Sequence, residues 1–68
     1  MQLSTRNQLK GKIKDIKKGP VSTEVILEVN ANTDVVASIT TGSADSMNLK
    51  AGDDVSALIK ASSVIIMK

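Results

Sequence analysis

Two short polar clusters contain the side chains of this sequence that are best suited to hold a charged ligand. They are Ser4-Thr5-Arg6-Asn7-Gln8 and Lys60-Ala61-Ser62-Ser63. Each cluster offers a cation, hydroxyls and backbone N–H groups at an expected bend, where successive N–H groups form concave anion-binding surfaces. Hydrogen bonds from Arg or Lys to an oxyanion are about twice as strong as neutral ones. Since neither cluster contains Asp or Glu, both favour an anion that carries no proton.

Taken alone, both clusters also have an ordinary structural interpretation. Ser, Thr and Asn before a strand are usually turn residues, and a Lys at the end of a strand is usually solvated. The composition excludes several classes of function, because the chain has no His and no Cys. It therefore lacks the commonest general base, the best nucleophile and the ligands of ordinary zinc, haem and iron–sulfur sites. We expect a binding protein without a cofactor, and not an enzyme.

The length of the chain predicts one domain, residues 1–68, that is stabilised by association with copies of itself. A chain of this size has a marginal core, and small scaffolds recover stability from disulfides, metals or oligomerisation. Without Cys and His, oligomerisation is the route that remains. There is no apolar run approaching the ~20 residues of a membrane span and no signal-peptide pattern, so we expect a cytoplasmic protein without a membrane partner.

Alternating hydrophobic residues predict an all-β fold. The expected strands are residues 9–17, 21–29, 34–40, 54–60 and 63–67. In the first strand Ile16 falls out of phase with Ile13, which predicts a β-bulge near Lys14 and Asp15.

The segment between the third and fourth strands, residues 41–49, predicts a short helix. Ser43 would cap this helix, and Met47 and Leu49 would close the end of the barrel. Residues 63–67 form a nearly continuous apolar run, typical of a strand that is covered on both faces, here by a neighbouring subunit. The order of elements predicts a five-stranded OB-like barrel with one short helix between strands 3 and 4.

The opening octapeptide identifies a family resemblance. Ser4-Thr5-Arg6-Asn7-Gln8-Leu9-Lys10-Gly11 resembles the Ser-Ala-Arg-Asn-Gln-Leu-Lys-Gly signature of the molbindins, the small molybdate-binding Mop proteins. The similarity continues in register through Lys17-Lys18-Gly19, Glu24-Val25 and Ala57-Leu58-Ile59-Lys60-Ala61-Ser62, and so spans essentially the whole chain. Thr5 departs from the usual Ala or Gly, a change that would either add a hydroxyl to the site or crowd it.

This resemblance implies a Mop-type OB-like domain assembled as a hexamer, a trimer of dimers, that binds molybdate or tungstate between subunits. Carried over to this sequence, Ser4 and Arg6 would come from one chain, and Lys60, the Ala61 N–H and Ser62 from its neighbour. Asn7 would fix the loop through backbone hydrogen bonds. The family also has a site on the threefold axis, for which Val21 and Ser22, after Pro20, are the candidates in this sequence.

The chemistry of such a site favours molybdate over phosphate. Molybdate is fully deprotonated near neutral pH and only accepts hydrogen bonds, whereas phosphate at pH 7 often carries a proton that needs an acceptor. A pocket that contains only donors leaves that proton unpaired. Sulfate carries no proton, so it must be rejected because it is too small to reach all the donors at once.

A nucleic-acid-binding OB module is the alternative. The sequence has a basic stretch that could follow a phosphate backbone: Lys10, Lys12, Lys14, Lys17 and Lys18. The net charge is only +2, and there is no Phe, Tyr or Trp for bases to stack on, so this alternative is the weaker one. A purely structural or regulatory module is a further alternative, but the chain has neither a helix-turn-helix nor a P-loop pattern. A freestanding storage or buffering protein is the simpler interpretation.

Overall fold

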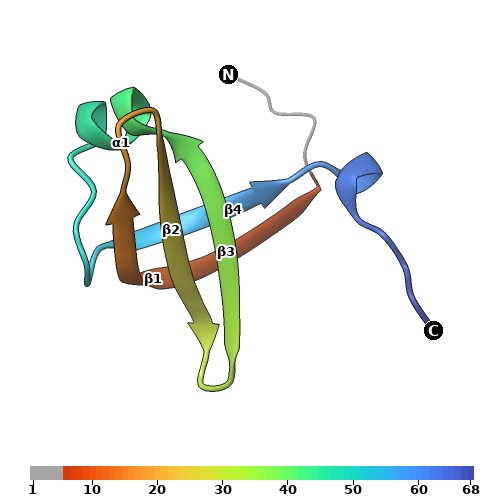
Figure 1. Cartoon of the computed structure of the whole chain (residues 1–68). Coiled ribbons are helices and arrows are strands. Elements are labelled where there is room, and N and C mark those ends of the chain that lie inside the picture. The colour runs from red at the N-terminus through yellow and green to blue at the C-terminus, as the bar shows by residue number, and fades with distance from the viewer. Residues whose placement is uncertain (1–5) are drawn as a thin grey trace.

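The computed structural model describes residues 6–68, which form one curled antiparallel sheet and two short helical segments. The elements in chain order are β1 (Asn7–Lys18), β2 (Ser22–Asn30), β3 (Thr33–Thr40), α1 (Thr41–Ser46), β4 (Asp54–Ile59) and the 3-10 turn η1 (Ala61–Ser63). The strand order is β3-β2-β1-β4 (Figure 1). The predicted all-β class and the short helix between the third and fourth strands are confirmed.

The long strand β1 changes partner halfway along its length. Its first half pairs with β4, from Asn7 opposite Ile59 to Lys12 opposite Asp54. Its second half pairs with β2, from Lys12 to Lys18. The strand bends between the two halves, so β4 crosses behind β2 and β3 in the view of Figure 1. The first half of β1 and β4 together form a two-stranded arm, residues 7–12 and 54–59, that leads away from the rest of the sheet.

The predicted β-bulge is confirmed at Lys14. The β1–β2 register shifts between Ile13 and Asp15. Ile13 is buried, and Ile16 packs against the core with part of its surface exposed. One extra residue in the strand restores the phase that simple alternation would lose, so both isoleucines face the interior.

The hydrophobic core is small. Its buried cluster consists of Ile13, Val25 and Leu27, and Ala44 of α1 is buried as well. Partly buried residues pack around the cluster: Ile16, Val35, Ala37, Ile39, Leu49, Val55 and Ala57. Within β2 the alternation of Thr23, Val25 and Leu27 toward the core is the period of two expected for a half-buried strand.

The predicted cap of the helix was wrong by three residues. Thr40, and not Ser43, is the N-cap of α1: its side chain accepts a hydrogen bond from the Ser43 N–H at 3.1 Å. Thr40 is the last residue of β3 and has the extended conformation that an N-cap requires, so the helix begins directly where the strand ends. Met47 is largely exposed, and of the two residues expected to close the end of the barrel only Leu49 packs against the core.

The fifth strand expected over residues 63–67 is absent from the described structure. Ser63 belongs to η1, and the segment after it has no regular secondary structure. A strand needs the edge of another strand to bond to, and after η1 the chain runs away from its own sheet (Figure 1). The described part of the chain is therefore an open four-stranded sheet, and not a closed five-stranded barrel.

Candidate functional site

The pairing of β1 with β4 brings the two polar clusters of the sequence to one place. The last pair of that ladder is Asn7 opposite Ile59. Arg6 directly precedes Asn7 in the chain, and Lys60 directly follows Ile59. Both residues are exposed, at the free end of the arm. Two cations that are more than fifty positions apart in the sequence thus lie at the same end of the sheet.

Asn7 joins the two sides of this end. Its side-chain Nδ2 donates a hydrogen bond to the carbonyl oxygen of Ile59 at 3.2 Å, and the bond is partly buried. This bond runs from a side chain to the backbone of β4. The acceptor could not be identified from the sequence, because any residue type supplies a carbonyl. The bond ties the residue after Arg6 to the residue before Lys60.

The second cluster lies in a turn. Lys60 is extended, with φ −61° and ψ 137°, and η1 follows it directly. The hydrogen bonds of the turn run from the Ser63 N–H to the Lys60 carbonyl at 2.9 Å and from the Val64 N–H to the Ala61 carbonyl at 3.3 Å. The N–H groups of Ala61 and Ser62 come at the start of the turn, where N–H groups have no partner within it. Ser4 and Thr5, the other predicted members of the site, lie outside the described residues.

Val21 and Ser22, the candidates for the site on the threefold axis, lie just after the opposite end of β1. The carbonyl of Val21 accepts from the Thr41 N–H at 2.9 Å, and the carbonyl of Ser22 accepts from the Gly19 N–H at 3.0 Å. The Val21 side chain is 78% exposed. The structure therefore does not bring these two residues together with Arg6 and Lys60.

Two hydrogen-bonded threonines, the buried Thr23 and the partly buried Thr41, hold this second end of the sheet. The Thr41 hydroxyl donates to the Gly19 carbonyl at 2.7 Å. A hydroxyl has one hydrogen, so in the 2.8 Å contact between the two threonine oxygens the donor must be Thr23, which is fully buried. The short chain of hydrogen bonds from Thr23 through Thr41 to Gly19 fixes the β1–β2 turn against the start of α1.

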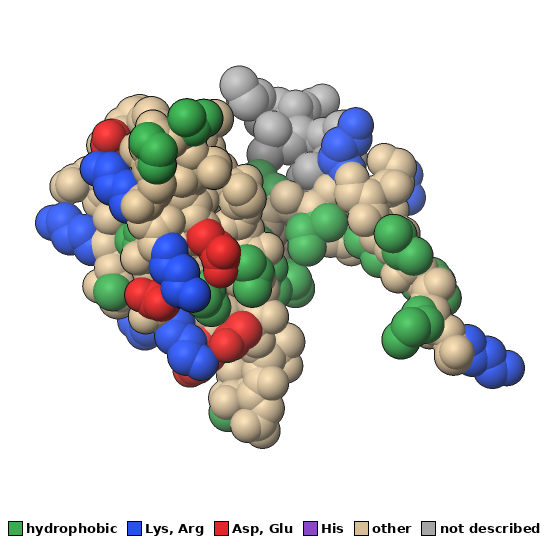
Figure 2. Space-filling view, viewed as in Figure 1, with side chains coloured by type: hydrophobic (Ala, Val, Ile, Leu, Met, Phe, Trp, Pro, Cys, Tyr) green, Lys and Arg blue, Asp and Glu red, His purple; other side chains and the backbone are tan. Residues whose placement is uncertain are grey.

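The basic stretch of β1 is largely paired with acids. Lys12 contacts Asp54 at 2.9 Å, Lys14 contacts Asp34 at 3.0 Å, and Lys18 contacts Asp45 at 2.6 Å. The hydrogen bond to Asp34 and the charge of that carboxylate raise the pKa of Lys14 above its ordinary value. Figure 2 shows basic and acidic side chains interleaved on the body of the sheet. This pairing reduces the positive charge that a nucleic-acid backbone would meet.

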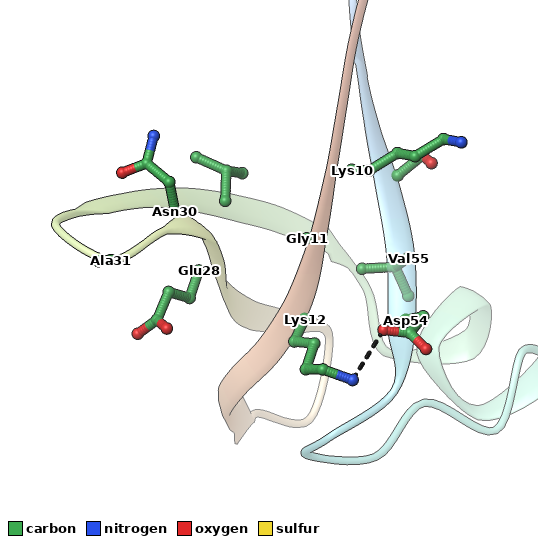
Figure 3. A pocket seen from close by; sticks show the side chains of 10 residues that line it. Lys10, Gly11, Lys12, Glu28, Asn30, Ala31, Asp54 and Val55 are labelled. Atoms are coloured by element: carbon green, nitrogen blue, oxygen red, sulfur yellow. Dashed lines mark hydrogen bonds and ion pairs between the residues drawn. The ribbon is translucent and has the colours of Figure 1, made fainter.

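An open pocket of about 840 Å³ lies where the two halves of β1 meet, and the sequence did not predict it. Gly11 lies at its centre, with Lys10 and Lys12 of β1 on either side (Figure 3). Glu28 of β2 and Asp54 of β4 place carboxylates in the same pocket. An oxyanion would meet these negative charges, so the pocket is a poorer anion site than the end of the arm. None of the predicted site residues within 6–68 lines it.

Two other kinds of site find no support in residues 6–68. These residues contain no group of three or more Asp and Glu side chains placed to hold a metal ion. No helix in the same range is long and apolar enough to cross a membrane.

Comparison with known proteins places the chain in a family. Residues 3–66 match the model of the TOBE domain. Molybdenum-pterin-binding protein 3 of Clostridium pasteurianum is 40% identical over 67 residues, which are 98% of both chains. A molybdate-binding protein from Sporomusa ovata has the same fold, with a TM-score of 0.94, 37% identity and complete coverage of both chains.

A third relative is a longer protein. The cytoplasmic molybdate-binding protein ModG, solved with molybdate bound, matches 96% of this chain with a TM-score of 0.89 and 40% identity, and the match covers 46% of ModG. The relatives are thus named as binding proteins. With a domain match over nearly its whole length and relatives of the same size and fold, the chain belongs to the TOBE-domain family and, within it, to the molbindin (Mop) proteins.

Proposed function

We propose that this protein binds molybdate or tungstate at the free end of the arm, in pockets shared between subunits of a homo-oligomer. One subunit would supply Ser4 and Arg6, and its neighbour Lys60, the Ala61 N–H and Ser62. The observation that carries the proposal is the β1–β4 register, which gathers Arg6 with the turn at residues 60–62.

The exposure of these residues supports a shared pocket. Arg6, Lys60, Ala61 and Ser62 are all exposed in the single chain. Charge-assisted hydrogen bonds are strong where water is excluded and weak where it is not. A second subunit that covers the end of the arm would supply the missing wall. We therefore propose a homo-oligomer, a hexamer built as a trimer of dimers, in which the ligand links neighbouring copies.

The donor set supports selection for an anion without protons. Arg, Lys and backbone N–H groups donate and do not accept, and no Asp or Glu occurs between residues 59 and 68 or among residues 1–14. A protonated phosphate would leave its hydroxyl unpaired, with a penalty of about 1–3 kcal/mol. Sulfate would fit the charge but would leave donors out of reach because it is smaller.

Storage is the role that we propose for this binding. The relatives of similar length are named as molybdenum-pterin-binding or molybdate-binding proteins, and the longer ModG is described as cytoplasmic. A protein that holds an oxyanion between its subunits, without catalytic groups beside it, serves to buffer intracellular molybdenum or tungsten. Molybdate and tungstate are nearly equal in size, so we propose both as ligands.

Calorimetric titration with molybdate, in buffer with excess sulfate and phosphate, tests the proposal. We expect saturable binding that weakens by about 10- to 150-fold in Arg6→Ala and in Lys60→Ala, because hydrogen bonds to charged groups contribute about 1.5–3 kcal/mol. Lys50→Ala is the matched control: Lys50 is exposed in the loop before β4, and it bonds to Asp53 through its backbone N–H and carbonyl, which the substitution leaves in place. Equal affinity for phosphate, or equal losses in all three variants, would contradict the proposal.

A further inference from the structure

Positive and negative side chains are distributed unevenly over the fold. All seven Asp and Glu residues of the chain lie between residues 15 and 54. Residues 12–54 also contain five lysines, so their net charge is −2. Residues 6–11 and 55–60, which we call the basic end, include the outer part of the arm and contain three cations and no acid: Arg6, Lys10 and Lys60. The net charge of +2 for the whole sequence conceals this separation.

The boundary between the two regions is the ion pair of Lys12 with Asp54, at 2.9 Å. Lys12 also lies opposite Glu28 of β2. From this point to the free end of the arm, neither β1 nor β4 has a further negative side chain. On the face drawn in Figure 2, acidic side chains lie only on the body of the sheet, where basic ones are interleaved with them. An anion therefore meets carboxylates near the body and only cations near the basic end.

Lys10 is the cation of the basic end that has no role in the proposed pocket. It lies in β1 opposite Ser56 of β4, and its side chain is exposed. It forms no ion pair within residues 6–68. In the view of Figure 3 its side chain extends away from Asp54 and Glu28. No carboxylate in this part of the chain neutralises its charge.

Lys10 lies beside the candidate site and not in it. It follows Arg6 by four positions, and four residues of extended chain span roughly 13 Å. Side chains of a strand stand roughly perpendicular to the sheet, so the two charges stay about this far apart. The separation is much longer than a hydrogen bond of about 2.9 Å, and similar to the distance over which 0.1 M salt screens a charge, about 10 Å.

The size of the attraction follows from Coulomb's law. Molybdate carries two negative charges, and a cation roughly 13 Å away in water changes its affinity by about threefold in the absence of salt. At an ionic strength of 0.01 M the screening length is about 30 Å, and about a twofold effect remains. At 0.15 M the screening length is about 8 Å, and the effect falls to about 1.2-fold.

We propose that Lys10 is a steering residue, which attracts the oxyanion to the basic end and raises its affinity by charge alone, without touching it. Because the attraction is proportional to the charge of the ligand, Lys10 favours a dianion over a monoanion. The carboxylates of the body act in the same sense, since they repel the anion from the rest of the surface. This inference rests on the proposed function, because it assumes that the anion binds between Arg6 and the turn at residues 60–62.

Calorimetric titration of the whole chain with sodium molybdate at two ionic strengths tests the steering role. The variants are Lys10→Arg, Lys10→Gln and Lys10→Glu. At 0.01 M we expect an unchanged affinity in Lys10→Arg, a loss of about twofold in Lys10→Gln and a loss of about fourfold in Lys10→Glu. At 0.15 M the last two losses should shrink to about 1.2-fold and about 1.5-fold.

Lys17→Gln and Lys17→Glu are the matched controls. Lys17 is also an exposed lysine of β1, but it lies in the second half of the strand, opposite Glu24. The controls change the net charge by the same amount at a greater distance from the site, so we expect less than about a twofold loss in either at 0.01 M. Equal losses at residues 10 and 17 would assign the effect to net charge and would overturn the proposal.

The salt dependence separates steering from contact. A loss in Lys10→Gln that is as large at 0.15 M as at 0.01 M would overturn the proposal in favour of direct contact with the anion. An unchanged affinity of Lys10→Glu at 0.01 M would also overturn it. If the native protein bound no molybdate at either ionic strength, the proposed function itself would fail. Native binding that ignores every change at residue 10 would refute the steering role alone.

Discussion

Replacing Gly11 by Ala should destabilise the protein because β1 and β2 approach each other closely there. A Cβ atom at this position would lie 2.6 Å from the carbonyl oxygen of Glu28 and 3.2 Å from a methyl group of Val29, whereas ordinary contact begins at 3.4 Å. The nearest atom is backbone, so it cannot rotate away as a side chain would. The strands must separate where β1 passes from β4 to β2.

The expected loss is about 2 kcal/mol. Added atoms in a packed site typically destabilise by about 1–3 kcal/mol, and this clash must exceed the ~0.4–1 kcal/mol that an alanine gains by restricting the unfolded chain. For a domain of this size each kcal/mol shifts Tm by about 4–8 °C, so Tm should fall by about 8–16 °C. The assay is thermal unfolding followed by circular dichroism at one fixed protein concentration, since the Tm of an oligomer depends on concentration.

Gly42→Ala is the matched control for this prediction. Gly42 lies in α1, and a Cβ atom there would meet nothing within 4 Å. The same substitution should therefore raise stability by about 0.5–1 kcal/mol, because glycine is unfavourable inside a helix. We therefore expect Gly11→Ala to lower the stability of the protein and Gly42→Ala to raise it. If Gly11→Ala raised Tm as Gly42→Ala does, the close approach of β1 and β2 would be refuted as the reason for the glycine.

Three further predictions concern single contacts. Thr40→Ala should destabilise by about 1 kcal/mol in urea unfolding, and by more than Ser43→Ala, because Thr40 is the N-cap of α1; equal losses would contradict this assignment. Thr23→Val should lower stability by about 0.5–1.5 kcal/mol, since it removes a buried hydrogen bond with little change of shape, and an unchanged urea midpoint would contradict the bond. By NMR titration the pKa of Lys14 should lie above its ordinary value of 10.5 and fall toward it in Asp34→Asn. Because the folded pKa is raised, the ion pair stabilises the protein at lower pH, and this contribution is lost as the pH rises through the folded pKa.

Local patterns in the sequence predicted the strands of the sheet well. The alternation of Thr23, Val25 and Leu27 depends only on which side chains avoid water, and this information is contained in the segment itself. The bulge at Lys14 could be predicted for the same reason, because the spacing of Ile13 and Ile16 fits a regular strand only with one extra residue. The N-cap of α1 was harder to predict, since Thr40 and Ser43 are both suitable cap residues. The position at which β3 ends decides between them.

Features that depend on contacts between residues distant in the sequence could not be predicted from local patterns. The ion pairs of Lys12 with Asp54 and of Lys14 with Asp34 follow from the register of strands that the sequence does not specify. The apolar run at residues 64–67 was predicted to form a strand covered on both faces, but in the described chain it is not a strand and is exposed. The strand predicted over residues 63–67 is not formed in the described chain.

The geometry of the candidate site is determined by the core and not by the site residues themselves. Arg6 and Lys60 are exposed and make no contribution to the buried cluster. They lie at the same end of the sheet because Val55 and Ala57 pack against the core and thereby fix the register of β4 on β1. If β4 slipped by one residue along β1, the side chains of Val55 and Ala57 would turn to solvent. The same slip would move Lys60 away from Arg6. The same packing that stabilises the sheet therefore sets the spacing of the cations, and a substitution such as Gly11→Ala, which touches neither of them, should weaken anion binding if the β1–β4 register is disturbed.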